Sequence, residues 1–500
     1  MITPHNTQAV VLAAGKSSRF KTKKSKLLFS ICGRTMVMYP LKALESLHIP
    51  ATVVLGHQAE EVKAEIQRQM PTGVQFAIQA EQKGTGDAVA ASRAHWQEEN
   101  ILILYGDTPL ITTSLIADLI AVHQNSKATI TFCTTFVIDP TGYGRVIEKE
   151  GKFEIVEEKN CTPEQRHITR INTGVYIMKR GFLEKNIDKI AKNAVTGEVY
   201  FVDLIKMACD QGLGVIAHPV AYDYVRGVNT LQELWEVEQI KRSEFIKHWM
   251  SEGVRFELAQ SIHIDIDVKI GSGSFIGTGA HLIGNTKIGE ECFVGAFSII
   301  ENSKIGNNTL IQPHTFVQDS SLGEHVQIGP FARLRGNSHI GNDVQIGNFV
   351  EIKATSIGNH SRTKHLSYLG DATIGENVNI GAGTIVCNYD GVKKNQTVIE
   401  DNVFIGSNNT LIAPVVIGKG SYTAGGSTIN ENVPAGSLAI GRSRQQLKEG
   451  YAEKIRSELI KKHNCACSGE EAEKKTAVNN SEENLAFKGA IKTTNISETA

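Results

Sequence analysis

The chain has 500 residues, of which 41% are hydrophobic and 21% charged, and its formal net charge is −1. This length allows two or three domains with separate cores, and the near-neutral charge predicts neither a nucleic-acid partner nor a membrane partner. No apolar run approaches the length of a membrane span, and the apolar segment 9–14 is too short for a signal peptide. We therefore expect a cytoplasmic protein.

Short β-branched runs alternate with amphipathic stretches over the first 225 residues. The expected strands are 10–12, 51–55, 74–78 and 101–104, and the expected helices are 36–47, 59–70 and 88–96. This alternation predicts a doubly wound α/β sheet, in which ligands bind beyond the carboxyl ends of the strands.

Polar and small residues follow two of these strands. The small-residue turn 12–15 is followed by Lys16 and Arg19, which could neutralise a phosphate approached by backbone N–H groups. Asp107 follows the strand 101–104 and could hold Mg²⁺ together with substrate phosphates. An ordinary turn explains either segment equally well when each is taken alone.

Residues 229–254 form one amphipathic stretch, which predicts a long helix that links two halves of the chain. We therefore expect an α/β domain at 1–228, a linker helix at 229–254, a second domain at 255–450 and an extension at 451–500. In that extension, residues 451–462 could form a short helix, whereas the polar segment 468–500 is expected to be disordered.

An aliphatic residue, often followed by Gly, returns every six residues between 264 and 429, as at Ile270, Ile276, Leu282 and Ile288. This period predicts a parallel β-helix of hexapeptides, with three flat faces and roughly nine turns. Flat faces favour assembly, and the period alone does not distinguish a catalytic β-helix from a purely structural one.

The six-residue register fails in two places. The segments 359–371 and 387–394 carry His, Arg, Lys, Tyr and Asn side chains, and we expect both to project from the β-helix as functional loops. A histidine in such a loop is a candidate general base, because its pKa lies near neutral pH.

Six ordered motifs, together with the hexapeptide half, carry a resemblance to a known family. The motifs are 12–19, 79–86, 105–107, 141–145, 171–174 and 227–229. Over about residues 7–450 the chain resembles the bifunctional N-acetylglucosamine-1-phosphate uridylyltransferases/glucosamine-1-phosphate acetyltransferases. The resemblance implies a nucleotidyltransferase domain, a left-handed β-helix, a homotrimer, and the substrates UTP, acetyl-CoA, glucosamine-1-phosphate and N-acetylglucosamine-1-phosphate, with Mg²⁺.

The resemblance also assigns residues to each activity. For uridylyl transfer it implies Leu12, Ala13, Ala14, Gly15, Lys26, Gln79, Gly84, Thr85, Tyr105, Gly106, Asp107, Gly144, Glu157, Asn172 and Asn229, with Asp107 and Asn229 also on the metal. For acetyl transfer it implies His365 as proton acceptor, Arg335, Lys353, Tyr368 and Asn379 for the amino-sugar phosphate, and Ala382, Asn388, Tyr389, Ser407, Gly425 and Arg442 for acetyl-CoA. Two alternatives remain: a monofunctional nucleotidyltransferase with a structural β-helix, and a non-catalytic assembly module.

Four positions depart from the family's usual pattern. Ser25 stands where Pro commonly precedes Lys26, so we expect a less rigid loop there. Asp87 stands where His is common, Lys364 where Gly is common, and Gly425 where Ala is frequent. Gly425 is smaller than the frequent Ala and should still let the pantetheine arm pass.

Overall fold

The central strand of the N-terminal sheet is β1 (Thr7–Ala13), which is buried along its whole length. The computed structural model describes residues 6–477, with side chains up to residue 464, and the chain divides at Gly441 into two units. Parallel partners flank β1 on both sides, with β4 (Ala51–Leu55) on one side and β6 (Asn100–Tyr105) on the other. The strand order therefore reverses at β1, and such a reversal leaves a crevice beyond the carboxyl ends of these strands.

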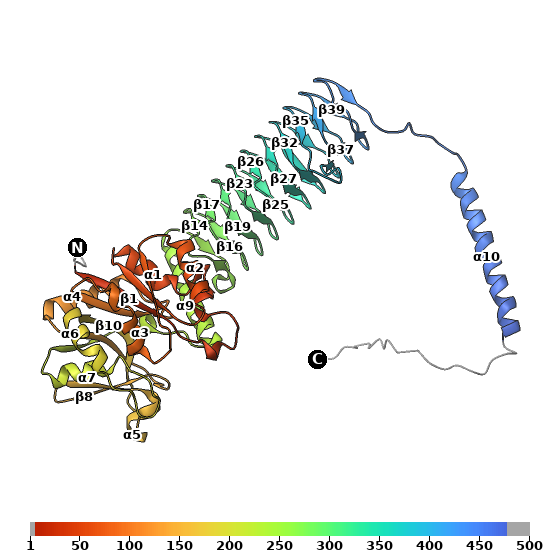
Figure 1. The fold of residues 1–500 in the computed structure, drawn as a ribbon. Coiled ribbons are helices and arrows are strands. Elements are labelled where there is room, and N and C mark those ends of the chain that lie inside the picture. Colours follow the sequence, from red (N-terminus) through yellow and green to blue (C-terminus); the bar gives the residue numbers. More distant parts are fainter. Residues whose placement is uncertain (1–5, 478–500) are drawn as a thin grey trace, which may run out of the picture. The chain divides into compact units, whose positions relative to one another are not determined.

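The remaining strands complete a mixed sheet of the order β11-β7-β10-β6-β1-β4-β5. Figure 1 labels β1, β8 and β10 of this sheet. Their bounds are β5 (Val74–Ile78), β7 (Ile130–Phe136), β10 (Arg170–Lys179) and β11 (Val215–Pro219), and a hairpin of β8 (Arg145–Lys149) and β9 (Lys152–Val156) pairs with β10. Because β10 runs antiparallel to β6 and β7, the sheet is not purely parallel.

Helices cover this sheet close to where the sequence predicts them. They are α1 (Met38–Ser46), α2 (Ala59–Gln69), α3 (Thr85–Ala91), α4 (Thr113–Ser126), α6 (Arg180–Asn186) and α7 (Asp203–Asp210). The helix expected at 88–96 instead begins at Thr85, and a 3₁₀ turn (Arg93–His95) follows it. Its first turn carries Gly and Thr in place of large apolar residues, so hydrophobic periodicity does not mark its start.

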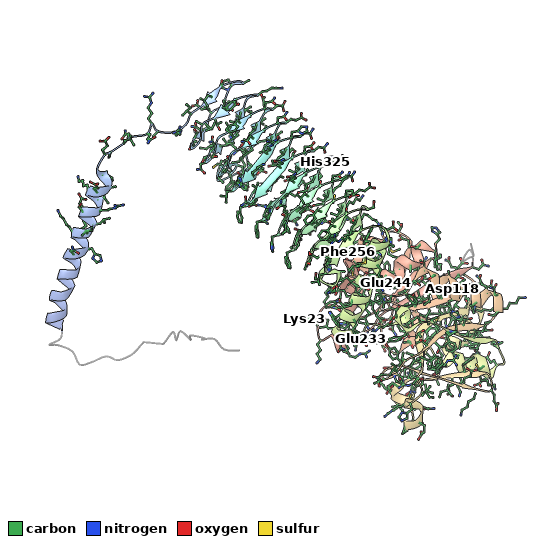
Figure 2. All side chains as sticks on the ribbon, turned by 180° about the vertical axis from the view of Figure 1, so that it is seen from behind. Lys23, Asp118, Glu233, Glu244, Phe256 and His325 are labelled. Atoms are coloured by element: carbon green, nitrogen blue, oxygen red, sulfur yellow. The ribbon has the colours of Figure 1, made fainter. Side chains whose placement is uncertain are left out.

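The linker helix α9 (Leu231–Ser251) joins the two halves of the molecule. Thr230 caps it, and Glu233, labelled in Figure 2, completes a capping box. Val237 packs in a cluster with residues of the N-terminal half, whereas Ile246 belongs to the core of the β-helix. One helix therefore contributes to two hydrophobic cores.

Strands from β12 (Arg255–Phe256) to β41 (Leu438–Ala439) form a left-handed parallel β-helix of three sheets with 11, 10 and 9 strands. The hexapeptide aliphatics stack in buried columns, for example Ile276, Val294, Ile311 and Ile328 in successive rungs. Residues at the corners adopt positive φ, and these include not only Asn and Gly but also Phe297, Phe331 and Phe349. Bulky residues rarely adopt this conformation, so the corner turns depend on more than backbone freedom.

The structure contradicts the projecting loop that we expected at 359–371. The segment continues the three sheets as β30 (Arg362–His365), β31 (Tyr368–Gly370) and β32 (Ala372–Ile374). Thr363 takes the buried inward position between Ile346 and Ile380. Thr363 replaces the aliphatic residue that marks the other repeats, so the sequence pattern did not reveal this one.

The second expected break does leave the β-helix. Between β34 (Ile385–Cys387) and β35 (Thr397–Ile399), residues 388–396 form an excursion with an isolated antiparallel bridge from Tyr389 to Lys394.

The C-terminal unit contains α10 (Tyr451–Ala477), which is longer than the short helix expected at 451–462. Residues 468–477, which we expected to be disordered, are its final turns. Their Glu, Lys and Ala residues are good helix formers, so low hydrophobicity did not prevent a helix here. The rest of the expected disordered segment, 478–500, lies outside the described residues. No helix among the described residues is long and apolar enough to cross a membrane.

Candidate active sites

A cavity of about 660 Å³ opens beyond the carboxyl ends of β1 and β6. It is lined by most of the residues expected for uridylyl transfer: Leu12, Ala13, Ala14, Gly15, Lys26, Gln79, Gly84, Thr85, Tyr105, Asp107, Glu157 and Asn229. The other three expected residues, Gly106, Gly144 and Asn172, do not line it. They lie close by, since the Gly106 N–H donates to the Leu12 carbonyl and the Asn172 N–H donates to the Gly144 carbonyl.

Cations and oxygen atoms converge at one end of this cavity. Lys26 Nζ lies 2.5 Å from Asp107 Oδ2, 3.1 Å from Asn229 Oδ1 and 2.9 Å from the Val228 carbonyl oxygen. Arg19 also donates to Asn229 Oδ1, at 2.8 Å. Three oxygen atoms from distant segments thus surround one positive charge, which is a suitable environment for a phosphate–cation complex.

The linker helix fixes one of these oxygen donors. The Glu233 carboxylate accepts hydrogen bonds from the N–H groups of Asn229, at 2.6 Å, and Thr230, at 2.8 Å. The capping box of α9 therefore holds the backbone of Asn229 beside Asp107. The Glu233 carboxylate therefore caps α9 and also positions Asn229 in the site.

The loop carrying Lys26 keeps the geometry that a proline would impose. Ser25 has φ −58 and is buried. Proline fixes φ near this value, so Ser25 supplies the same backbone path without the covalent constraint. The loop therefore keeps the conformation that a proline would give it, and only the covalent restraint of the proline ring is missing.

Gln79, whose side chain is buried, also lines the cavity. Gly84, at φ +115, lets the chain pass close to Val199, because a Cβ on Gly84 would lie 2.4 Å from the Val199 carbonyl oxygen. Only glycine fits this close approach.

Glu157 lines the same cavity as a half-buried carboxyl group. Burial raises its pKa above the usual value, and the neighbouring carboxylates of Asp203 and Glu198 raise it further. Gly144 leaves room for it, since a Cβ there would lie 3.4 Å from Glu157 Oε1. Glu198 and Tyr200 also line the cavity, and sequence reasoning missed them because no recognisable motif marks their segment.

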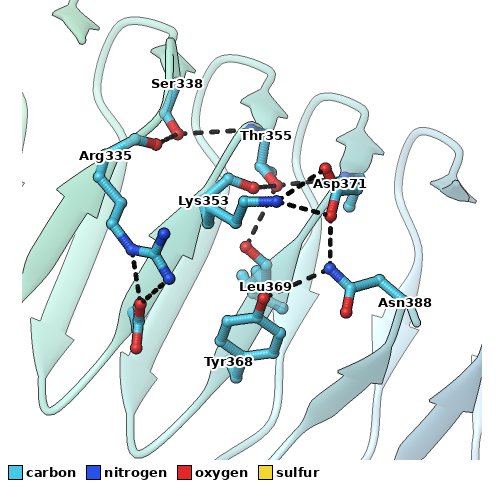
Figure 3. Close-up of polar contacts among 10 residues, drawn as sticks. Arg335, Ser338, Lys353, Thr355, Tyr368, Leu369, Asp371 and Asn388 are labelled. Atoms are coloured by element: carbon cyan, nitrogen blue, oxygen red, sulfur yellow. Dashed lines mark hydrogen bonds and ion pairs between the residues drawn. The ribbon is translucent and has the colours of Figure 1, made fainter. Parts of the chain in front are cut away.

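The second site lies on the β-helix, on the 10-stranded sheet (Figure 3). Arg335 and Lys353 stand on adjacent rungs, β25 (Arg333–Arg335) and β28 (Glu351–Lys353). Arg335 pairs with Glu351 at 2.8 Å, and Lys353 pairs with Asp371 at 3.1 Å. Asn388 donates to Asp371 and, at 3.3 Å, to the Tyr368 hydroxyl. The structure therefore gathers four of the residues expected for acetyl transfer.

His365 stands at the corner between this sheet and the 11-stranded one, exposed at the end of β30. Its Nδ1 lies 2.9 Å from Oδ1 of Asn348, on the preceding rung β27 (Gln345–Asn348). An amide oxygen only accepts, so Nδ1 carries the proton and Nε2 is the basic nitrogen. Asn348 was not among the expected residues, and the hexapeptide register, which puts it one rung before His365, could have identified it.

Small residues continue the column of His365 along the same edge of the β-helix. The Gly383 N–H donates to the His365 carbonyl, the Asn408 N–H to the Ala382 carbonyl and the Gly426 N–H to the Ser407 carbonyl, so that Ala382, Ser407 and Gly425 occupy successive rungs. This edge is open for an extended arm that ends at His365. Arg442 is the first residue of the C-terminal unit.

One expected residue lies away from this cluster. Asn379 is on β33 (Asn379–Ile380) in the 11-stranded sheet, paired with Arg362, whereas Lys353 and Tyr368 are on the 10-stranded sheet. The half-buried side chains of Asn379 and Tyr368 alternate with inward residues and so face outward from two different faces.

Acidic and histidine side chains do not form a ready-made metal cluster: within the described part of the chain, no group of three or more His, Cys, Asp or Glu residues could hold an ion. Asp107 and Asn229 together supply one carboxylate and one amide oxygen. That number is sufficient for Mg²⁺ only where substrate phosphates complete the coordination.

Models of three protein families match the chain. The MobA-like NTP transferase domain matches residues 9–150, the GMPPB C-terminal domain matches residues 258–370, and the bacterial transferase hexapeptide (six repeats) matches residues 396–431.

Curated relatives match both halves together. The bifunctional protein GlmU of Alkaliphilus metalliredigens is 41% identical over 449 residues, which are 89% of this chain and 97% of that protein. Those of Koribacter versatilis and Fervidobacterium nodosum are 41% and 42% identical, and the matches cover 92% and 90% of this chain and 100% and 98% of theirs. The chain belongs to the GlmU family of bifunctional enzymes, with a nucleotidyltransferase in its α/β domain and an acetyltransferase in its hexapeptide β-helix.

Proposed function

We propose that the β-helix acetylates glucosamine-1-phosphate with acetyl-CoA, and that the α/β domain then transfers UMP from UTP to the N-acetylglucosamine-1-phosphate so formed. The convergence of Lys26, Arg19, Asp107 and Asn229 in the cavity, with the Gln79 amide in the same lining, carries the uridylyl assignment. We place both reactions in the cytoplasm, where UTP and acetyl-CoA are made.

In uridylyl transfer, a phosphate oxygen of the sugar phosphate attacks the α-phosphorus of UTP. A P–O bond forms, the bond to the β-phosphate breaks in line, and pyrophosphate leaves. Lys16, Arg19 and Lys26 lie in the cavity wall, where their charges can stabilise the phosphate oxygens during the transfer. The Gln79 amide, in the lining of the same cavity, would bind the uracil ring.

Asp107 and Asn229 are the residues that would hold Mg²⁺. Their oxygen atoms already surround a cation, the Lys26 ammonium, so the site stabilises positive charge. A bound Mg²⁺ would neutralise charge that builds up on the phosphates. We expect a chelator to abolish uridylyl transfer and leave acetyl transfer unchanged.

In acetyl transfer, the sugar nitrogen attacks the thioester carbonyl, its proton passes to His365 Nε2, and the CoA thiolate leaves. Asn348 holds the imidazole in the tautomer that leaves Nε2 unprotonated. Arg335 and Lys353 are held in place by Glu351 and Asp371 and would bind the sugar phosphate.

We further propose that the protein is a homotrimer whose acetyl-transfer sites lie between copies. Asn379 and Tyr368 face outward from different faces, so a second copy is needed to bring both residues to one sugar. An apolar ladder also runs along the edge that ends near His365. Phe297, His314, Phe331 and Phe349 stack with ring centroids 5.0 to 5.5 Å apart, and each Phe is at least half exposed. Burial of this ladder in an assembly would offset the unfavourable backbone conformation at its corners.

Mixed assemblies test this arrangement. Tyr368→Ala and Asn379→Ala should each reduce acetyl transfer strongly. If each site uses one residue from each of two copies, random co-assembly of the two variants should restore about a quarter of the wild-type activity, because that fraction of sites is intact. No recovery in assemblies that sedimentation shows to be mixed trimers would contradict the proposal.

The alternative of a structural β-helix predicts no acetyl transfer at all. Both half-reactions should therefore be assayed on the full chain, with each sugar phosphate supplied separately. Uridylyl transfer alone would favour a monofunctional enzyme, and the absence of both activities would favour an assembly module.

A further inference from the structure

Asp87 is the first acidic residue of α3, and it does not line the nucleotide cavity. Its carboxylate instead contacts the side chain of Gln79, which does line the cavity. Gln79 Nε2 donates to Asp87 Oδ2 at 2.8 Å and to the Gly84 carbonyl oxygen at 3.0 Å. Both protons of the Gln79 amide are therefore engaged away from the ligand.

This pair of acceptors permits only one orientation of the amide. A carboxylate and a carbonyl oxygen accept hydrogen bonds and cannot donate. If the amide were flipped, its oxygen would face two oxygen atoms inside a buried pocket without a proton between them, which is strongly unfavourable. Gln79 Oε1 is consequently the atom left for a ligand, and the site presents an acceptor.

An acceptor that faces N3 of the base suits one pyrimidine better than the other. Uracil carries a proton on N3, whereas N3 of cytosine has a lone pair in its place. We propose that Asp87 is a specificity-determining positioning residue, which selects UTP over CTP by holding the Gln79 amide with its oxygen toward the base. This inference rests on the proposed function, because it assigns Gln79 to the uracil.

The experiment measures kcat/KM of the full chain for UTP and for CTP with N-acetylglucosamine-1-phosphate. In Asp87→Asn the neighbour can donate as well as accept, so a flipped Gln79 amide would face one acceptor-only oxygen, the Gly84 carbonyl, in place of two, and the preference for one orientation should weaken. We expect the UTP/CTP ratio to fall by about ten- to a hundredfold, through KM for UTP more than through kcat, because the base is remote from the reacting phosphorus. Asp87→Glu keeps an acceptor-only group and should retain more of the ratio than Asp87→Asn.

Two controls separate orientation from a general structural effect. Glu81→Gln removes a carboxylate from the same segment, but Glu81 is exposed and pairs with Lys83 at 2.8 Å, so the ratio should not change. In a Gln79→Ala background, Asp87→Asn should have no further effect on the ratio, because Asp87 acts through Gln79. Because acetyl transfer belongs to the separate core of the β-helix, the thermal melting of each variant, and not its acetyl transfer, reports whether the α/β domain is folded.

Two results would overturn the inference. One is an unchanged UTP/CTP ratio in Asp87→Asn, with both nucleotides losing the same factor, and the other is an equal drop of the ratio in the Gln79→Ala background. Failure of the proposed function would look different, because the wild-type protein itself would then not use UTP.

Discussion

The two active sites are constructed in different ways. In the α/β domain, one chain folds residues as distant as Lys26, Asp107 and Asn229 around a single cavity. In the β-helix, functional residues stand in rows one rung apart, about 4.8 Å from each other, and they are divided between two faces. The first set of residues meets within one chain, whereas we propose that a neighbouring copy completes the second site at the edge of the β-helix.

The largest expected effect separates the two sites completely. Asp107→Ala removes the carboxylate from the oxygen cluster, so the proposed Mg²⁺ site loses its only charged ligand, and uridylyl transfer should become undetectable. Acetyl transfer should remain near the wild-type rate, because the halves have separate cores. Both rates can be measured on one preparation, with the exposed Asp118→Ala, labelled in Figure 2, as the matched control. Equal loss of both activities would indicate unfolding or a shared site.

The reciprocal effect is expected for His365→Ala. The side chain is exposed, so the substitution should cost little stability, and uridylyl transfer should persist. Acetyl transfer should fall by about 10²–10⁴-fold in kcat with little change in KM for acetyl-CoA, because a general base is lost and binding is retained. Exposed His360→Ala, on the same coil, is the control. A loss confined to KM would make His365 a binding residue.

The predictability of the two regions also differs, and for physical reasons. The strands at 51–55 and 74–78 were predicted with the observed bounds, because each is a short β-branched or aromatic run. Asp107 and the turn 12–15 were predicted because they follow such strands. Glu198 and Tyr200 were not, because only tertiary packing brings their segment to the cavity.

In the β-helix, periodicity alone predicted the architecture. It also misled at Thr363, where one inward hydroxyl made a regular coil look like a loop. The column of Ala382, Ser407 and Gly425 came from the resemblance, but the reason these residues are small became visible only with the rung register. The inward positions of such a repeat are therefore better identified by counting residues from one rung to the next than by residue type.

An intermediate effect is expected at the positioning residue of the β-helix. Asn348→Ala frees His365 to adopt either tautomer and other rotamers, so kcat for acetyl transfer should fall by about tenfold with KM for the sugar phosphate unchanged. Asn348→Asp still accepts from Nδ1 and should restore most of the rate. Gln345→Ala, an amide on the same strand, is the control. If Asn348→Asp were as slow as Asn348→Ala, the hydrogen bond would not explain the effect.

The smallest effect is expected at Glu157, inside the nucleotide cavity. Its pKa is raised by burial and by Asp203 and Glu198, so it gains a proton at a higher pH than an ordinary carboxyl group as the solution is acidified. If the charged form binds a hydroxyl of the sugar, KM for N-acetylglucosamine-1-phosphate should rise as the pH falls. In Glu157→Gln this dependence should disappear, with KM at neutral pH about three- to tenfold above wild type, the cost of replacing a charged acceptor by a neutral one. The substrate phosphate titrates in the same range, but it does so for both proteins, so the ratio of their KM values isolates Glu157.

Ionisation of Glu157, which should favour sugar binding, should lower the folding stability of the free protein. A carboxyl group whose pKa is higher in the folded state than in the unfolded state weakens folding as the pH rises through that interval. Above the interval, Glu157→Gln should therefore melt at a higher temperature than the wild type, and the difference should shrink as the pH falls below the unfolded pKa. Glu154→Gln, at a half-buried carboxylate of β9 paired with Lys206, should show neither effect. A lower melting temperature for Glu157→Gln at neutral pH would mean that the ionised carboxylate stabilises the free enzyme, and its role in sugar binding would then have to be separated from a structural one.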